Sequence, residues 1–192
     1  MSNETLDCRG LVCPQPVVET KKKLAMMPFG VLAVLVDNDV AKENLIKLAD
    51  SLHMEVMACE EDGLFTVSVL KEERDVVAQE DTGNNVLLIT ADTFGSGNDE
   101  LGALLIQSFF YALAESEKTP KAVYLVNSGV KLACDGSGVL DSLGKLEELG
   151  AAVFSCGLCL DFFQLKDNLR VGGVTNMYAI VEALVKWRAV IL

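Results

Sequence analysis

Basic residues are scarce in this sequence of 192 residues, and their scarcity excludes one class of protein. Lys and Arg together number 16 against 28 Asp and Glu, so the formal net charge is −12. Nucleic acids are bound largely through positive surface charge that neutralises phosphates. We therefore expect no direct binding to nucleic acid, and a protein or a small molecule as partner.

Long apolar runs are also missing, although hydrophobic residues make up 51% of the chain. No run approaches the roughly 18 residues that a membrane-spanning helix needs. The first five residues are polar or acidic, unlike a secretory signal. The sequence therefore predicts a cytoplasmic protein with a folded core and no membrane contact.

Histidine occurs once, at His53, whereas cysteine occurs six times. In a cytoplasmic chain, so many cysteines indicate buried thiols, metal ligation or thiol chemistry rather than a disulfide framework. Free cysteine is commonly a small buried hydrophobic residue. We interpret Cys59 and Cys134 in that way.

The first 71 residues predict a small α/β domain with the order βαβαββ, a two-layer sandwich. Helical spacing of apolar residues alternates with aliphatic strands, and the turn at residues 61–63 predicts a hairpin. After an extended start at residues 5–8, the expected helices cover 14–27 and 40–52, and the expected strands cover 31–36, 55–58 and 64–70. Residues 72–85 have the acidic composition of an exposed linker.

Residues 86–192 predict a second domain, a three-layer αβα unit with a mostly parallel sheet, because strands alternate with helices. Asn98 is expected to cap the first of these helices, an interpretation that we prefer to a phosphate cradle for the glycine-rich residues 93–98. The expected strands cover 86–90, 122–126, 151–154 and 189–192, and the expected helices cover 99–114, 139–149 and 176–186.

Cys13 is the first candidate for chemistry, because Pro14 follows it where a helix begins. Proline is well tolerated at the first helical position, which places Cys13 at or beside the N-cap. Free backbone N–H groups and the positive end of the helix dipole favour a thiolate there. Pro16 stiffens this first turn, and the site needs no histidine base.

The stretch Leu6-Asp7-Cys8-Arg9-Gly10-Leu11-Val12-Cys13-Pro14-Gln15-Pro16, followed by Thr20-Lys21-Lys22, closely resembles the TusA/SirA-like sulfur-carrier family over residues 4–71. The hallmark is Cys-Pro-x-Pro preceded by Asp-x-x-Gly-Leu, which includes Asp7 and Gly10. This resemblance implies that Cys13 accepts a sulfane sulfur from a donor such as a cysteine desulfurase and passes it to a downstream acceptor. Cys8 either resolves the persulfide or is an ordinary side chain on a strand.

A second thiol motif, Cys156-Gly157-Leu158-Cys159, follows an expected strand of the parallel sheet. Functional groups gather at the carboxyl ends of such strands, so we expect an exposed and reactive thiol. Thioredoxin-like folds have a cis-proline after this motif that faces the disulfide. None of the four prolines of the chain follows residue 159, which argues against a thioredoxin-like disulfide. Zinc would need two further ligands, such as Cys134 and His53.

A third interpretation rests on resemblance. From residue 85 the chain resembles the DsrE-like family of sulfur-relay subunits, in which a reactive cysteine occupies the place of Cys156. The segments at 94–102, 156–163 and 174–178 resemble the YedF-like proteins, in which a TusA-like domain is fused to a DsrE-like domain. That resemblance implies a role in sulfur or selenium metabolism, and DsrE-like proteins commonly form homo-oligomers.

These observations predict a two-domain sulfur-relay protein, which we expect to be a sulfurtransferase. Cys13 carries sulfur or selenium as a persulfide or perselenide and exchanges it with Cys156, while Cys159 resolves the adduct or helps to hold it. We expect no resident cofactor or metal. Two alternatives remain open: a dithiol redox protein that uses Cys156 and Cys159, and a non-catalytic regulatory adaptor.

Overall fold

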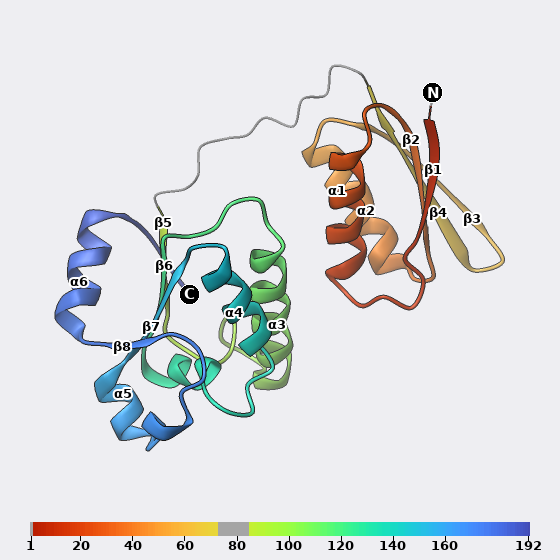
Figure 1. The fold of residues 1–192 in the computed structure, drawn as a ribbon. Coiled ribbons are helices and arrows are strands. Elements are labelled where there is room, and N and C mark those ends of the chain that lie inside the picture. The colour runs from red at the N-terminus through yellow and green to blue at the C-terminus, as the bar shows by residue number, and fades with distance from the viewer. Residues whose placement is uncertain (1, 73–84) are drawn as a thin grey trace. The chain divides into compact units, whose positions relative to one another are not determined.

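The computed structural model describes residues 2–72 and 85–192, which fall into two compact units (Figure 1). Unit 1 comprises Met1–Glu80 and unit 2 comprises Asp81–Leu192. The linker predicted over residues 72–85 lies, apart from its two end residues, outside the described residues.

Unit 1 is built on a mixed four-stranded sheet, and the predicted order βαβαββ is confirmed. The strand order is β1-β2-β4-β3, in which β1 runs parallel to β2 and the other neighbours are antiparallel. The elements are β1 (Ser2–Asp7), α1 (Gln15–Met26), β2 (Gly30–Val36), α2 (Asp39–Ser51), β3 (Glu55–Glu61) and β4 (Leu64–Lys71).

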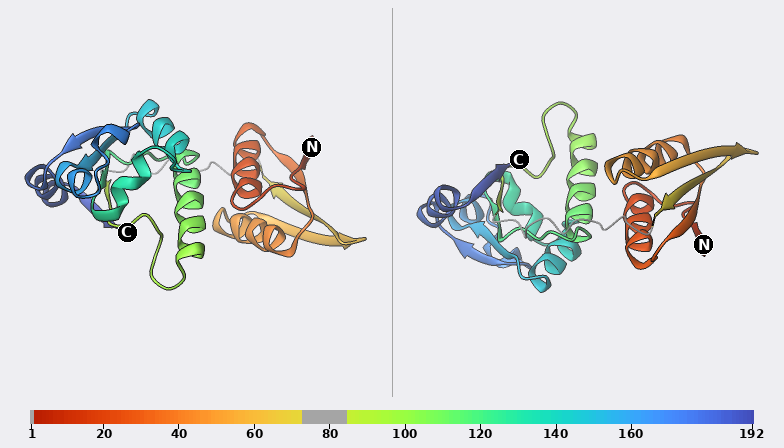
Figure 2. Two further views of the ribbon diagram at one scale, coloured as in Figure 1. Left: turned by 90° about the horizontal axis from the view of Figure 1, so that it is seen from below. Right: turned by 90° about the horizontal axis from the view of Figure 1, so that it is seen from above.

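The core of unit 1 lies between the sheet and its two helices, which share one face of it (Figure 2). Burial alternates along β2, so that Leu32 and Val34 point inward. Leu24 of α1 and Leu45 of α2 meet them and are equally buried. Each such side chain contributes about 1.5–3 kcal/mol through burial, which explains why the helices stay on the apolar face.

The placement of two cysteines tests the prediction that both are buried. Cys134 is 1% exposed, which confirms that prediction. For Cys59 the prediction is wrong, because its side chain is exposed. Cys59 lies on β3, an edge strand, and the alternation of the strand turns it away from the helices.

Unit 2 is built on a five-stranded sheet of order β8-β7-β6-β5-β9, in which every neighbouring pair is parallel. This confirms the predicted parallel sheet. The helices and strands are β5 (Asn85–Ile89), α3 (Asp99–Ala114), β6 (Ala122–Leu125), α4 (Leu140–Glu148), β7 (Ala152–Cys156), α5 (Gly157–Phe162), β8 (Gly173–Thr175), α6 (Met177–Lys186) and β9 (Arg188–Ile191), with 3₁₀ segments η1 (Asn127–Ala133) and η2 (Lys166–Asn168).

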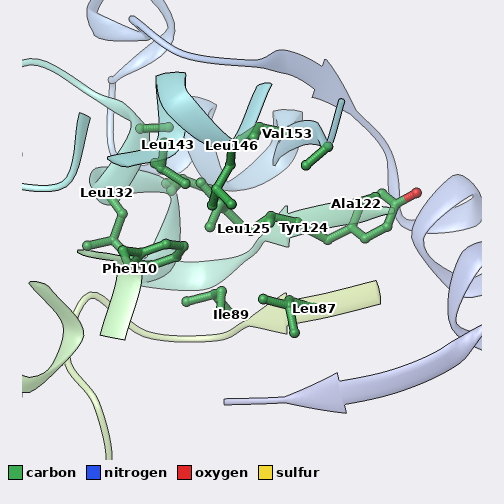
Figure 3. Packing of buried hydrophobic residues seen from close by; sticks show 14 of the residues in the cluster. Leu87, Ile89, Phe110, Ala122, Tyr124, Leu125, Leu132, Leu143, Leu146 and Val153 are labelled. Atoms are coloured by element: carbon green, nitrogen blue, oxygen red, sulfur yellow. The ribbon is translucent and has the colours of Figure 1, made fainter. Parts of the chain in front are cut away.

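The core of unit 2 surrounds β6, whose four residues are all buried. Phe110 of α3 and Leu143 of α4 are fully buried with Leu125 of β6, and Figure 3 shows them packed together. The Asn98 side chain accepts a hydrogen bond of 2.8 Å from the Leu101 N–H, which confirms the predicted cap of α3.

Several short elements were not predicted, and two of them, η1 and β8, lie beside the thiol motif. The 3₁₀ segment η1 directly follows β6, and the three residues of β8 pair with the end of β7. A Cβ added at Gly157 would lie 3.0 Å from the Val174 side chain, so β8 approaches the start of α5 closely. Segments this short have too few residues to show a period in the sequence.

Candidate functional site

Cys13 lies in the loop between β1 and α1, and its side chain is exposed. The predicted position of Cys13, at or beside the N-cap of this helix, is confirmed, although the helix begins one residue later than expected. Pro14 is the N-cap and Gln15 is the first helical residue, so Cys13 precedes the cap, and the Cys13–Pro14 peptide bond is cis. Pro16 falls in the first turn as expected, and it is buried.

The backbone donors expected to face Cys13 have other partners. The Gln15 N–H donates to the Val12 carbonyl at 2.9 Å, and the Val17 N–H donates to the Pro14 carbonyl at 3.0 Å. Prolines carry no N–H group. The helix start therefore does not supply the free N–H groups that the sequence suggested.

A side chain of α2 provides a donor instead. The Nδ2 amide of Asn44 lies 3.8 Å from the Sγ atom of Cys13 and donates to it. Because these residues are 31 positions apart, sequence reasoning missed Asn44. An amide donor can stabilise a thiolate or the charged end of a persulfide without adding a net charge.

Three side chains hold the loop that carries Cys13. Asp7 accepts hydrogen bonds from the Arg9 guanidinium at 2.8 and 2.6 Å and from the Arg9 N–H at 3.1 Å. These bonds lower the pKa of Asp7 to about 2. The Gly10 N–H donates to the Asp37 carboxylate at 2.7 Å, which lowers the pKa of Asp37.

Gly10 itself is required by the backbone of this loop, since its φ of 74° is one that other residues rarely adopt. Asp7 and Gly10, both predicted to support the site, therefore act by shaping the loop. Asp37, at the end of β2, is a further supporting residue that carried no sequence signal.

The surface around Cys13 is mostly apolar. A small pocket beside it is lined by residues of the loop, of α1 and of the start of α2: Leu11, Cys13, Pro14, Pro16, Val17, Asn38, Val40, Ala41 and Asn44. Val12 and Val40 are 70% and 63% exposed. Such a surface suits contact with the face of another protein better than with a charged metabolite.

Cys8, five residues before Cys13, is buried in the core of unit 1 and is 1% exposed. Burial raises the pKa of its thiol, and Glu19 and Asp7 raise it further. A buried protonated thiol is a poor nucleophile. The structure therefore favours the interpretation of Cys8 as an inert core side chain.

The second thiol pair lies at the carboxyl end of β7. Cys156 ends the strand and caps α5, whereas Cys159 lies within α5. The prediction of an exposed thiol is wrong for Cys156, which is 3% exposed and belongs to the core cluster of unit 2. Neighbouring strands and α5 enclose the strand end. Cys159 packs against that cluster but is partly exposed.

A backbone N–H at the start of η1 forms a hydrogen bond with Cys159. The N–H of Asn127 donates to the Sγ atom of Cys159 at 3.1 Å. Burial is the main cause that raises the pKa of Cys159, a hydrogen bond with Cys156 raises it further, and the Asn127 N–H opposes both. Asn127, which lies two residues after the end of β6 and has a φ of 52°, is a contributor that sequence reasoning missed.

Other polar residues follow β5 and β6 at the same edge of the sheet. Lys131 donates to Asp92 at 3.0 Å, and its ammonium lies 5.2 Å from the centre of the Phe163 ring. Although burial opposes it, hydrogen bonds from Lys131 and Ser128 lower the pKa of Asp92. Because the strands are parallel, their carboxyl ends lie on the same side of the sheet, and the polar groups and the thiol pair are found there together.

The composition of the described residues, 2–72 and 85–192, bears on metal binding and on membrane insertion. They contain no group of three or more His, Cys, Asp or Glu side chains that could hold a metal ion. None of their helices is long and apolar enough to cross a membrane.

Unit 1 is a small α/β domain, and its exposed cysteine, Cys13, lies on a loop that hydrogen bonds hold in place. Residues 4–71 match the family model described as Sulfurtransferase TusA. A "Putative sulfur carrier protein" of Thermotoga maritima is 44% identical over 61 residues, which are 31% of this chain and 77% of that protein. A protein of the same description from Neisseria meningitidis serogroup A is 41% identical over 71 residues, covering 36% of this chain and 96% of that protein.

Among solved structures, the SirA-like protein of Desulfitobacterium hafniense is 40% identical, with a TM-score of 0.34 and coverage of 35% of this chain and 95% of that chain. Through its first 71 residues, this chain belongs to the TusA family of sulfur carriers. The family and its relatives support a role in sulfur relay.

Proposed function

We propose that this protein carries sulfane sulfur as a persulfide on Cys13 and exchanges it with the thiol pair of unit 2. The observation that carries the proposal is the exposed Cys13 sulfur on a braced loop, with the Asn44 amide donating to it, in a chain of the TusA family. A carrier needs a thiol that a partner can reach and that a donor group can stabilise when charged.

The loading step is a displacement between sulfur atoms. The Cys13 thiolate attacks the outer sulfur of a donor persulfide, the new bond joins Cys13 Sγ to that sulfur, and the donor leaves as a thiolate. No external oxidant or reductant is consumed. A cysteine desulfurase is the proposed donor, and the exposed apolar surface at Val12 and Val40 is where we place its contact.

Unit 2 is proposed as a DsrE-like, three-layer domain that receives or returns this sulfur. Cys156 and Cys159 lie at the carboxyl end of β7, and the resemblance to DsrE-like proteins implies a reactive cysteine at the place of Cys156. A downstream acceptor protein then takes the sulfur onward, either as sulfane sulfur from a persulfide or as the sulfide that is released when the thiol pair forms a disulfide. Selenium is included in the proposal, because a perselenide uses the same thiolate chemistry.

Self-association of the chain is part of the same proposal. The outer side of α6 carries exposed apolar side chains, with Met177 56%, Tyr178 74% and Val185 84% exposed. A second copy of the chain would remove this apolar surface from water. Light scattering coupled to size-exclusion chromatography should give at least the mass of a dimer, and a monomer would contradict this part.

The central experiment is intact-protein mass spectrometry after incubation with a cysteine desulfurase and cysteine. Wild-type protein should gain the mass of one sulfur atom, and reduction should remove it. Cys13→Ala should gain none by this route, while Cys156→Ala should still be loaded at Cys13. Equal loading of wild-type protein and Cys13→Ala would overturn the proposal.

The Cys-x-x-Cys spacing favours a second candidate, a dithiol redox protein, because Cys159 packs against the core cluster that contains Cys156. Reduction of insulin that depends on Cys156 and Cys159 but not on Cys13 would support it. A third candidate, a regulatory adaptor, would be supported by a stable complex that survives substitution of all three cysteines.

A further inference from the structure

The two sulfurs of unit 2 differ sharply in access. Cys156 is 3% exposed and lies among the core residues of unit 2, whereas Cys159 packs against this core from its partly exposed position. Sulfur transfer requires the incoming sulfur to reach the attacking sulfur along the line of the breaking bond. The burial of Cys156 and the partial exposure of Cys159 therefore favour approach to Cys159.

The hydrogen bond at Cys159 reinforces this difference. The Asn127 N–H donates to the Cys159 sulfur at 3.1 Å in an exposed part of the unit, and Asn127 is the first residue of η1. A fixed N–H donor stabilises negative charge on the sulfur that it faces. Burial still raises the pKa of Cys159, which slows attack by this thiol but does not block approach to it.

We propose that sulfur enters unit 2 at Cys159 and that Cys156 is the resolving cysteine, the reverse of the order predicted from the sequence. This inference rests on the proposed function of unit 2 as a site for sulfane sulfur. It assigns the first covalent adduct to the second cysteine of the Cys-x-x-Cys motif.

The two steps of one turnover balance without another reactant, and a thiol reductant then returns the disulfide to two thiols. In the first, the Cys159 thiolate attacks the outer sulfur of a persulfide, the bond between that sulfur and the donor breaks, and the donor leaves as a thiolate. In the second, the Cys156 thiolate attacks Cys159 Sγ and forms a disulfide, and hydrosulfide leaves. The sulfane sulfur is reduced to sulfide as the two cysteines are oxidised.

Access is tested first on the unmodified full-length chain, by brief treatment with limiting iodoacetamide and peptide-level mass spectrometry. Cys159 should be alkylated about ten-fold or more faster than Cys156, because thiol reactivity follows exposure and thiolate character. Cys13, which is exposed, and Cys134, which is 1% exposed in the same unit, are the fast and slow controls. Alkylation of Cys156 at or above the rate of Cys159 would overturn the inference.

The position of the adduct is tested with inorganic polysulfide in a Cys13→Ala background, so that loading of unit 2 does not depend on Cys13. Adding Cys156→Ala should leave one stable extra sulfur on Cys159, since the resolving thiol is gone. Adding Cys159→Ala instead should leave Cys156 without sulfur. Cys156→Ser serves as a second form if the alanine variant unfolds.

The two proposals fail in different ways in these experiments. If polysulfide loads Cys159 but a desulfurase does not load Cys13, the proposed relay through Cys13 is contradicted, and the proposed entry of sulfur at Cys159 is still supported. Persulfide found on Cys156 in the Cys159→Ala protein would overturn the entry point and leave the relay intact. The absence of extra sulfur from both double variants, Cys13→Ala with Cys156→Ala and Cys13→Ala with Cys159→Ala, would contradict both.

Discussion

The backbone N–H of Gly10 donates to the carboxylate of Asp37 across 2.7 Å, joining the Cys13 loop to the end of β2. The two residues are 27 positions apart, so this bond exists only in the folded unit. It restrains the loop just before the cysteine, while the Arg9 side chain pairs with Asp7 at its start. Hydrogen bonds to Asp7, at the end of β1, and to Asp37, just after β2, therefore restrain the loop that carries Cys13.

Removal of the Asp37 carboxylate should loosen that loop. In Asp37→Ala, we expect the Gly10 amide hydrogen to exchange faster and sulfur loading of Cys13 to slow by several-fold, on the order of a lost charge-assisted hydrogen bond. Hydrogen exchange and timed desulfurase loading measure the two effects. Asp39→Ala is the matched control, because Asp39 pairs with Lys42 within α2. Equal loading of both variants would contradict the role of Asp37.

The Asn44 amide should control the reactivity of Cys13 through charge. In Asn44→Asp, a carboxylate of the same shape replaces the amide donor that lies 3.8 Å from the sulfur. Repulsion between like charges should then slow alkylation of Cys13 about ten-fold at neutral pH, because a nearby like charge disfavours the thiolate.

Two comparisons separate this electrostatic effect from damage to the fold. Asn44→Ala should slow alkylation less than Asn44→Asp does, since it removes the donor without adding a charge. Glu43→Gln, which alters the neighbouring residue of α2, should leave the rate unchanged. Identical rates in Asn44→Asp and wild-type protein would show that the amide does not act on Cys13.

The Asp7 carboxyl should titrate at low pH. Its pKa of about 2, against an ordinary value of 3.8, comes mainly from the Arg9 side chain and then from the Arg9 N–H. Because the pKa is lowered by folding, the stabilisation is fully present above pH 3.8 and is lost as the pH falls towards 2. Carboxyl ¹³C NMR titration measures this value directly, and Arg9→Gln should raise it. A titration of Asp7 near its ordinary value in wild-type protein would contradict the pairing.

Stability of unit 2 should depend on the side chains that enclose β6. Leu146 of α4 is fully buried, so Leu146→Ala should cost about 2–5 kcal/mol of the free energy of unfolding through lost burial and a residual cavity. Trp187 is the single tryptophan of the chain and packs against the core of unit 2, so its fluorescence reports the unfolding of this unit. Leu149→Ala, at a position that is 50% exposed, should change stability by about 0.5 kcal/mol or less.

The sequence by itself determined the order of the main elements, because burial on one face of a helix or strand leaves a period that can be read directly. The aliphatic run of β2 and the alternating hairpin β3–β4 predicted unit 1, and strands alternating with helices predicted the parallel sheet of unit 2. The motif around Cys13 also identified the carrier family, since several fixed positions agreed together.

Only the tertiary structure decided which groups surround each sulfur. Asn44 reaches Cys13 from α2, and the Asn127 N–H reaches Cys159 from the end of β6, across sequence separations of 31 and 32 residues. Burial of Cys156 and exposure of Cys59 likewise depend on which sheet face and which strand end the neighbouring elements cover. A local pattern specifies the direction in which a side chain points along its own element, but access and hydrogen-bond partners come from segments that meet only when the chain folds.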